Sequence, residues 1–460
     1  MAVHSSINLS QIEYSRIDAD FYHPIYLNEI HDWEILKKNV GVLKLSQLIT
    51  APVRTGRTPS SRTIKNDDQL ISFVKTDTLR QGYIDFTKSS NLPIRVLTAS
   101  DFITPHSVVV TIIGATPEIV GRAAIVRDTD PQCVTNQNVA VISTNEKCDP
   151  YFLTAYLQTK YGRDQLWRHS RRTEQVNLNC REVERILVPN PAIEIQKEIG
   201  DFVRNSFSTS DKSEVLFAQA QQLLESELGL DKLSFHKPLG YTAKFSELEL
   251  SRRLDAQHYQ AQFTQLLAHL AKFPTRKIRD IKTLNRRGIQ PIYVNDGSFD
   301  VINSQHLGSK HINYDGLEKT SHRYFSASPV AHIRKNDLLI YTTGAYIGRT
   351  NVYLSDAPAF ASNHVNILRI TPDIDAAYMA MVFQSVVGQF QTQKHSRGSA
   401  QAELYPNDID KFVVPILPFE QQTIIGDLVH ESLVKQKESA RLLQQAKTRV
   451  EQLIEAAVQS

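Results

Sequence analysis

Basic side chains recur in two short segments of this sequence, WRHSRRTEQ and QKHSRGSAQ, which match each other position by position. The alignment places His169 on His395 and Arg171 on Arg397, 226 positions apart. Such side chains donate hydrogen bonds to phosphates and to base edges. A single basic cluster is usually a solvated surface, but recurrence at matched positions favours a polyanion as the partner. The two segments contribute Arg168, His169, Arg171, Arg172, Lys394, His395 and Arg397 as candidate binding residues.

Two earlier pairs of matched segments extend this pattern. The loop RTGRTPS matches NRRGIQP, and the turn VKTDTLRQG matches INSQHLGSK, which offers amides where the first copy offers cations. Arginine, asparagine and glutamine are the side chains that pair with base edges most readily. The loops add Arg54, Arg57, Arg286 and Arg287 to the candidates, and the turns add Lys75, Thr76, Arg80, Asn303, Gln305 and His306.

The segment TIIGATPEIVGRAAIV, residues 111–126, places two glycines inside a β-branched run, as a phosphate-binding loop or a structural turn would. A P-loop requires G-x-x-x-x-G-K-[ST], because backbone amides and the lysine converge on the same phosphates. Here Gly114 and Gly121 are separated by six residues, Arg122 precedes an alanine, and the second copy shortens the spacing to GAYIG. We therefore interpret the segment as a tight turn that joins two strands.

Other catalytic and metal-binding patterns are incomplete. Asp149-Pro150-Tyr151 lacks the second proline of the D-P-P-Y motif of adenine methyltransferases, and no G-x-G follows a predicted strand. Asp280-Ile281-Lys282 lacks the upstream acidic partner of a nuclease site. No histidine has a second ligand at helical spacing. We expect no catalytic residue, no metal site and no resident cofactor in this chain.

The composition is that of a globular chain with balanced charge. Of the 460 residues, 41% are hydrophobic and 22% are charged, which suffices for ordinary cores. The net charge of +3 is too small to imply nucleic acid by itself, so any basic surface must be local. Cys133, Cys148 and Cys180 form no C-x-x-C pair, which predicts free thiols in a reducing compartment. Without a secretory start or an apolar stretch of about 18 residues, we expect a cytoplasmic protein with no membrane partner.

The matching extends over most of the chain. R-I-D-A-x-x-Y at Arg16 matches R-L-D-A-x-x-Y at Arg253, and further motifs follow in the same order. The separation between matched residues falls from 237 here to 226 at Pro189 and Pro415. Short insertions in loops explain this drift, since loops tolerate changes of length and packed elements do not. The sequence therefore predicts two copies of one domain.

Within each copy, strands come first and helices follow. The runs SVVVTII, RAAIV and VAVI, with Gly, Pro, Asn and Asp between them, are typical of strands and turns. DPYFLTAYLQTKYGRDQL begins with Asp149-Pro150 and carries apolar residues at helical spacing, and its counterpart begins at Asp375. Each copy is therefore predicted to be a mixed α+β domain.

A long amphipathic helix is predicted after each domain. Its apolar seam has heptad spacing, through Ala440, Leu443, Lys447, Val450, Ile454 and Ala457 in the second copy and through Leu216, Ala220, Leu223, Glu227 and Leu230 in the first. The seams most simply pack against one another, although each helix could instead fold back on its own domain. The Ser-rich segment 206–211 and Gly229 predict interruptions. The predicted boundaries are 1–191 and 237–417 for the domains, and 192–236 and 418–460 for the helical spacers.

In their order and their repetition, these motifs resemble the specificity subunits of type I restriction-modification systems. Each copy has that family's R-[IL]-D-A-x-x-Y opening, a G-x-x-P loop, the IIGA or TTGA turn leading to G-R, and a strand that contains asparagine. A Y-x-L/M helix, Q-x-x-L and a closing proline pair, VPNPAIEIQKEI or VPILPFEQQTII, complete each copy. The first closing motif departs from the pattern, because Ile195-Gln196 stands where Glu-Gln is usual.

The resemblance implies two target-recognition domains in a pseudo-twofold arrangement, separated by an antiparallel coiled coil of the two helices. Each domain would read one part of a bipartite, asymmetric duplex DNA target. Two methyltransferase subunits would dock on the helices and bring motor and nuclease subunits with them. S-adenosylmethionine, ATP and Mg would belong to those partners, and this chain would not be an enzyme. In this interpretation the turns at 75–80 and 303–306 read bases, and the basic clusters contact phosphates.

Other functions agree with the same residues. A fused methyltransferase or nuclease needs a catalytic domain, for which residues 15–460 leave no room, and S-adenosylmethionine binding by the purified chain would indicate one. A non-DNA scaffold, which assembles proteins through its coiled coil, would leave duplex binding without sequence preference. A recognition subunit of another methyltransferase or phage-defence assembly is a further alternative.

Overall fold

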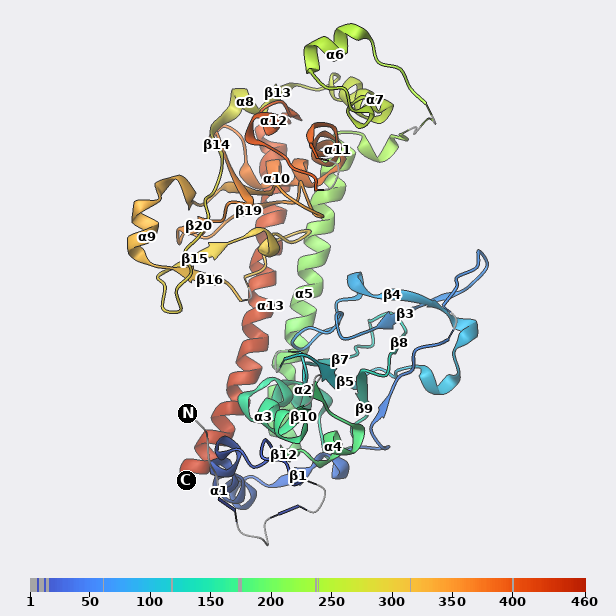
Figure 1. The fold of residues 1–460 in the computed structure, drawn as a ribbon, viewed down its shortest axis with the longest axis vertical. Coiled ribbons are helices and arrows are strands. Elements are labelled where there is room, and N and C mark those ends of the chain that lie inside the picture. The colour runs from blue at the N-terminus through green and yellow to red at the C-terminus, as the bar shows by residue number, and fades with distance from the viewer. Residues whose placement is uncertain are drawn as a thin grey trace. The chain divides into compact units, whose positions relative to one another are not determined.

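The computed structural model describes residues 6–7, 12–13, 16–60, 62–116, 119–172, 176–235, 238, 240–314, 316–398 and 401–460. The internal contacts divide the chain into two units (Figure 1). Unit 1 comprises Met1–Thr209 and Lys437–Ser460, and unit 2 comprises Ser210–Gln436. Two long helices, α5 (Ile193–Glu227) and α13 (Phe419–Gln459), therefore contribute a part to each unit.

A four-stranded antiparallel sheet forms the centre of unit 1. Its order is β2-β9-β5-β7. Val108, Val109 and Val110 in the central strand β5 are fully buried, and such β-branched residues favour strands that are covered on both faces. The strands are β2 (Arg54–Thr55), β5 (Val108–Thr111), β7 (Ala123–Ile125) and β9 (Val139–Ile142).

Smaller sheets and helices surround this centre. The sheets have the orders β4-β3-β8, β10-β11-β6 and β1-β12. Their strands are β1 (Val42–Lys44), β3 (Leu70–Val74), β4 (Ser90–Pro93), β6 (Ile113–Gly114), β8 (Cys133–Thr135), β10 (Arg171–Arg172), β11 (Val176–Asn177) and β12 (Leu187–Pro189). The helices are α1 (Pro24–Asn39), α2 (Pro150–Gln158), α3 (Lys160–His169) and α4 (Cys180–Arg185).

Unit 2 repeats this topology. Its central sheet has the order β14-β21-β18-β19, and its second sheet has the order β16-β15-β20-β17. The strands are β13 (Thr275–Lys277), β14 (Lys282–Arg287), β15 (Phe299–Ile302), β16 (Glu318–Thr320), β17 (His332–Ile333), β18 (Asp337–Tyr341), β19 (Thr350–Tyr353), β20 (Ala359–Ala361), β21 (Val365–Ile370) and β22 (Val413–Pro415). The helices are α6 (Phe245–Ser251), α7 (Ala261–Leu270), α8 (Ile278–Ile281), α9 (His322–Ala327), α10 (Ala376–Gln384), α11 (Val386–His395) and α12 (Pro406–Ile409).

The strand register confirms the internal repeat. β1 pairs with β12 so that Val42 lies opposite Pro189, and β13 pairs with β22 so that Thr275 lies opposite Pro415. In both second sheets the middle strand has one antiparallel and one parallel neighbour. The second copy forms α9 and β17 in a stretch that is no longer than its counterpart, since Ile312 and Gly348 are 36 positions apart and Ile84 and Gly121 are 37 apart. The predicted α+β class is confirmed for both copies.

The glycine-containing segment is a turn between neighbouring strands of the central sheet. Gly121 precedes β7 with a φ of 85°, and its counterpart Gly348 precedes β19 with the same φ. This left-handed conformation is costly for residues with a Cβ atom. The interpretation as a structural turn is therefore confirmed by both copies, and Pro117 and Glu118 of the quoted segment lie outside the described residues.

Matched polar caps start the first helix after each sheet. Asp149 accepts hydrogen bonds from the backbone amides of Tyr151 and Phe152, as the Asp-Pro pattern predicts. The side-chain oxygen of Gln196 then accepts from the amide of Asp149 at 3.0 Å, which ties the start of α5 to the start of α2. Gln422 does the same for Asp375 in unit 2, also at 3.0 Å. The departure at Ile195 therefore leaves the function of the closing motif intact.

Parts of the two long helices pack together within each unit. In unit 1, Glu198 lies 3.5 Å from Arg449 and the Ser206 hydroxyl lies 2.9 Å from that of Ser439. Residue numbers rise along α5 as they fall along α13, so these parts run antiparallel. In unit 2, the Ser213 hydroxyl donates to the Ser432 carbonyl at 2.7 Å. Each helix part also enters the core of its unit, with Val203, Phe207, Ala446, Val450 and Ile454 in unit 1 and Phe217, Ala220, Leu224, Ile425 and Val429 in unit 2.

The interruption predicted at residues 206–211 is wrong, because α5 is continuous from Ile193 to Glu227. Ser206 and Ser213 are fully buried, and their hydroxyls find partners on α13, so helix packing outweighs the low helix propensity of serine. The predicted seam is also partly out of register, since Ser439 and Ala446 are buried where Ala440 and Lys447 were expected. Gly229, in the left-handed conformation, does follow the end of the helix. Of the helices in the described ranges, none combines the length and the apolar character that crossing a bilayer requires.

The packing of α13 in the core of unit 1 can be tested with two isoleucines of the same helix. Ile454 is 1% exposed and Ile424 is 49% exposed. Ile454→Ala is expected to lower the free energy of unfolding by about 3 kcal/mol, because it leaves a cavity in the core. Ile424→Ala, the control, is expected to change it by less than about 0.5 kcal/mol. Equal midpoints for the two variants in urea unfolding would contradict this packing.

Candidate nucleic-acid interface

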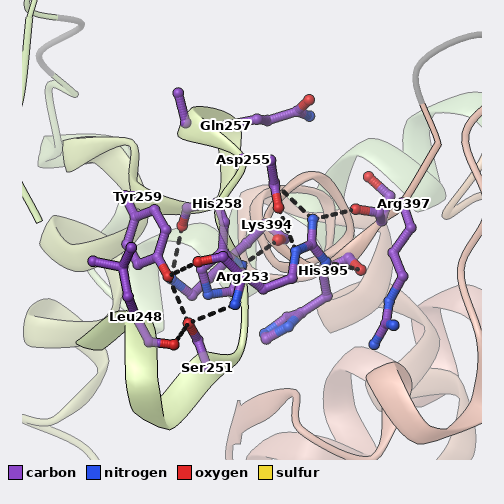
Figure 2. A network of polar contacts seen from close by, with 12 residues as sticks. Leu248, Ser251, Arg253, Asp255, Gln257, His258, Tyr259, Lys394, His395 and Arg397 are labelled. Carbon is purple, nitrogen blue, oxygen red and sulfur yellow. Dashed lines mark hydrogen bonds and ion pairs between the residues drawn. The ribbon is translucent and has the colours of Figure 1, made fainter. Parts of the chain in front are cut away.

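An arginine holds the end of α11, which carries Lys394 and His395 of the second basic cluster (Figure 2). Arg253 donates two hydrogen bonds to Asp255, from Nε to Oδ1 at 2.5 Å and from Nη2 to Oδ2 at 2.7 Å. The same guanidinium donates to the carbonyls of His395 at 3.3 Å and Ser396 at 2.9 Å. These carbonyls lie at the C-terminal end of a helix, where carbonyls lack helical partners. The fork with Arg253 lowers the pKa of Asp255, so the pair stays charged.

Aromatic and basic neighbours complete this network. The Tyr259 hydroxyl donates to the Arg253 carbonyl at 2.6 Å, and its oxygen lies 2.5 Å from the Ser251 hydroxyl. His258 and Lys394 are joined by two hydrogen bonds. The imidazole Nδ1 lies 2.8 Å from the Lys394 carbonyl oxygen, and the Lys394 ammonium donates to the His258 carbonyl at 3.0 Å. Figure 2 shows these side chains converging from the 248–259 segment and from the end of α11. Segment and helix end are thus fixed to each other.

Unit 1 contains the same arrangement. Arg16 forks onto Asp18, with Nε at 2.8 Å from Oδ2, and donates to the carbonyls of His169 at 2.6 Å and Ser170 at 3.0 Å. The Tyr22 hydroxyl donates to the Arg16 carbonyl at 2.9 Å. The R-[IL]-D-A-x-x-Y motif therefore has a structural function in both copies: it fixes the helix end that carries the first residues of each basic cluster.

The histidines of the basic clusters are withdrawn from the surface, His169 being buried and His395 half-buried. His169 is 6% exposed, and burial lowers its pKa to about 3. Burial also lowers the pKa of His395 to about 3. The His169 ring meets Phe21 edge-on at 5.4 Å, and the His395 ring meets His258 edge-on at 5.7 Å. Both imidazoles are therefore neutral near pH 7 and add no positive charge to the surface.

Two matched arginines present their guanidinium groups to solvent. The side chain of Arg171 is 59% exposed and that of Arg397 is 52% exposed. Arg171 Nε donates to Glu182 Oε1 at 3.0 Å, and Arg397 Nη2 donates to Asp408 Oδ1 at 2.9 Å. Both carboxylates are buried, so each fixes one edge of its arginine and leaves the rest free.

Each of these carboxylates has a second cation beside it. Arg16 Nη1 lies 3.8 Å from Glu182, and Lys411 Nζ lies 2.9 Å from Asp408. Burial alone would raise the pKa of Asp408, but hydrogen bonds from Arg397 and Lys411 lower it, so it stays ionised. In unit 1 Arg16 also pairs with Asp18, so the two cations are balanced there. In unit 2, Arg397 and Lys411 beside the single anion Asp408 leave a net positive charge. Such a site attracts phosphate.

The remaining side chains of the basic clusters bind within their own unit. Arg168 lies over the Phe21 ring at 4.5 Å, and burial lowers its pKa. Arg172 donates to Asp20 at 3.1 Å and to the Tyr26 hydroxyl at 3.0 Å. With Lys394 held by His258, the seven residues predicted from these clusters divide into three exposed arginines, of which Arg172 is also bonded within its unit, and four that contribute to packing.

The four predicted loop arginines differ in whether their guanidinium groups are bonded within their own unit. Arg57 forks onto Asp101, with Nε to Oδ1 at 2.8 Å, and this hydrogen bond lowers the pKa of Asp101 to about 2. Arg54 donates to the Phe102 carbonyl at 2.7 Å. Arg287 donates to Glu403 at 3.2 Å and lies 4.8 Å from the Tyr405 ring centroid. Arg286, on β14, is exposed.

In the predicted base-reading turns, several side chains are buried or form hydrogen bonds within the turn itself. Arg80 donates to the carbonyls of Asp77 and Leu79, both at 3.0 Å, and Lys75 and Thr76 are half-buried. Asn303 caps a short 3₁₀ helix by accepting from the Gln305 amide at 3.1 Å. His306 is 3% exposed, and burial lowers its pKa. Gln305 is exposed, so this turn presents its glutamine most openly.

An open groove of about 410 Å³ in unit 2 was not predicted from the sequence. The loop after α11 and the start of α12 form it. It depends on pairing with the TTGA turn, where the Gly344 amide donates to the Ala402 carbonyl at 3.1 Å. Its lining residues are Arg397, Gly398, Gln401, Glu403, Tyr405, Asn407 and Asp408. The repeated Q-x-x-L motif marks this loop in the sequence, but its concave shape depends on long-range pairing.

Comparison with known proteins shows which family these residues resemble. Residues 37–215 match the model of the type I restriction modification DNA specificity domain. These residues, most of which belong to the first copy, are therefore similar to a type I restriction-modification DNA specificity domain. The counterpart in unit 2 shares the order of the central sheet and the arginine fork described above.

Two solved structures of similar proteins align with most of this chain. The S subunit of a type I restriction-modification system from M. genitalium is 12% identical, with 90% of this chain and 95% of that chain covered and a TM-score of 0.46. The HsdS subunit from Thermoanaerobacter tengcongensis is 15% identical, with 90% and 96% covered and a TM-score of 0.30. With TM-scores below 0.5, these likenesses add nothing to the family match. No curated protein matches the sequence.

Across the described ranges, no group of three or more His, Cys, Asp or Glu side chains is placed to hold a metal ion. The chemistry at the surface of the specificity domain and of its counterpart is that of donors and cations. Among the predicted residues, the exposed hydrogen-bond donors are Arg57, Arg171, Arg172, Arg286, Gln305 and Arg397. Such groups suit a polyanion with readable edges.

The arginine fork can be tested by a change that keeps the charge. Arg253→Lys loses the planar donors that meet Asp255 and two carbonyls at once, and it is expected to lower the free energy of unfolding by about 2 kcal/mol. Hydrogen exchange at the end of α11 should accelerate. Arg252→Lys, at the exposed neighbouring arginine, is the control and should change stability by less than about 0.5 kcal/mol. Indistinguishable variants would show that the fork does not hold the helix end.

Proposed function

We propose that this chain is the DNA sequence-recognition subunit of a type I restriction-modification complex. The family match of residues 37–215 to a DNA specificity domain carries the proposal. The repeat supports a second recognition domain, because unit 2 has the same order of strands in its central sheet and the same arginine fork as unit 1. A subunit with two such domains contacts two separate parts of one duplex.

The proposed target is bipartite and asymmetric. The two copies share their framework but present different side chains on their loops, such as Arg80 in the first copy and Gln305 in the second. Different donors and acceptors pair with different base edges, so the two half-sites are expected to have unlike sequences. Bases between the half-sites are not read. This is the pattern of dimeric readers, in which protein geometry sets half-site spacing.

Arg171 and Arg397 are proposed to contact phosphates. Both are exposed, both lie beside a buried carboxylate and a second cation, and they occupy matched positions in copies that would read unlike sequences. A contact present in both copies suits the part of DNA that does not vary, which is the phosphate backbone.

The partners proposed for the long helices are two methyltransferase subunits, through which motor and nuclease subunits join the complex. Aliphatic side chains on the outer surfaces of these helices support docking, because Val215 is 56% exposed, Ile424 49% and Val434 60%. Exposed apolar groups on a helix are typical of protein interfaces. Methyl transfer, ATP-driven motion and cleavage, with S-adenosylmethionine, ATP and Mg, are assigned to those partners, and this chain is proposed to be non-catalytic and to work in the cytoplasm.

The proposed function can be tested in the cells that contain the intact system. Methylome sequencing with and without an intact copy of this chain is expected to show one split, asymmetric methylated motif that disappears on deletion. A deletion strain whose methylated motifs are unchanged would contradict the proposal. Replacing residues 37–215 with the matched segment of another specificity subunit serves as a control, because it should change one half of the motif and leave the other.

Two arginine substitutions should separate phosphate contact from base reading. Arg171→Ala is expected to weaken binding to every duplex and to reduce the slope of log affinity against log salt concentration by about 0.9, the share of one phosphate contact. Arg80→Ala is expected to change the preferred base at one position. Fluorescence anisotropy with the methyltransferase complex at several salt concentrations measures both. A position-specific effect of Arg171→Ala would reverse its assignment.

A further inference from the structure

Two residues that differ between the copies occupy one matched, exposed position. Arg181 is the second residue of α4, and Asn407 is the second residue of α12. Each directly precedes the buried carboxylate, Glu182 or Asp408, that holds the exposed arginine of its unit. Arg181 and Asn407 are both exposed. The same framework therefore presents a guanidinium in unit 1 and an amide in unit 2.

The surroundings of Asn407 are those of a binding site. It lines the open groove of about 410 Å³ together with Arg397, Gln401 and Tyr405. The Tyr405 side chain is 40% exposed, and Arg287 and Arg397 lie 4.8 and 6.0 Å from its ring centroid. The groove thus combines a flat aromatic surface, a cation and side-chain amides, which suits a nucleobase beside a phosphate.

Differences within a shared framework distinguish reading from support. The arginines Arg171 and Arg397, their carboxylates and the buried Leu178 and Leu404 are of the same type in both copies. Position 181 or 407 changes type, and no packing requirement fixes it, because both side chains are exposed. Residues that read unlike half-sites must differ between the copies while their supports stay the same.

We propose that Arg181 and Asn407 read bases, Arg181 a guanine in one half-site and Asn407 an adenine in the other. This inference rests on the proposed function in DNA recognition. An asparagine amide donates to N7 and accepts from the N6 amino group of adenine, and arginine donates to O6 and N7 of guanine. The neighbouring Arg397, fixed on one edge by Asp408, holds the backbone phosphate while Asn407 reaches the base.

Binding-site selection from randomised duplexes tests the inference, with the chain assembled with its methyltransferase subunits. Asn407→Arg is expected to change one position of one half-site from adenine to guanine, by roughly tenfold to a hundredfold in relative affinity. Asn407→Ala should relax that position without a new preference. Arg181→Asn should make the reverse change, from guanine to adenine, in the other half-site.

A matched control separates base reading from added charge. Asn295→Arg places the same charge on an exposed site of unit 2 that does not line the groove, and it should tighten binding to all duplexes without changing the motif. If Asn407→Arg and Asn407→Ala select the parent motif, or if Asn295→Arg alters it in the same way, the inference is overturned and the proposed function stands. If the parent complex selects no motif, the proposed function itself is overturned, and the inference with it. If Asn407→Arg does not assemble, Asn407→Ala and Arg181→Asn decide.

Discussion

The bonds from one arginine to the open carbonyls at a helix end determine how each unit presents its surface. Arg16 and Arg253 each join a carboxylate of their own loop to carbonyls of a helix far away in sequence. A guanidinium can serve three acceptors at once because its donors are planar and diverge, and lysine lacks this geometry. The segment that follows, with the exposed arginine and the variable residue, is thereby held in a fixed position. Precise contact with DNA requires such preorganisation.

In each unit, some cationic side chains bind within the fold and others are exposed. Arg16, Arg168 and Lys394 donate hydrogen bonds to carbonyls inside their own unit, and the imidazoles of His169 and His395 are neutral. The small net charge of +3 is therefore compatible with a strongly directed local field, because the few free guanidiniums sit beside carboxylates that orient them. The matched positions of Arg171 and Arg397 place this field in the same frame of both copies.

The sequence patterns pointed to candidate segments, but they did not distinguish exposed from buried residues within those segments. The matched clusters mark corresponding segments of the two copies, because repetition reveals which positions a fold requires twice. They could not separate Arg171 from His169, since these residues lie two positions apart but His169 is buried at the end of α3 and Arg171 is exposed on β10. Residues 206–211 were misread for a related reason: the partners of Ser206 and Ser213 lie on α13, more than two hundred residues away.

The sequence by itself determined the two copies, their α+β class, the capped helix starts at Asp149 and Asp375 and the turn at Gly121, because spacing, capping chemistry and positive φ are local properties. Tertiary structure alone decided the groove at Asn407 and the register of the helix seam. The groove exists because Gly344 and Ala402 pair across a long loop, and the seam buries Ser439 and Ala446, whose small size matters only against a facing helix. Long-range pairing and shape complementarity are not encoded in any short stretch of chain.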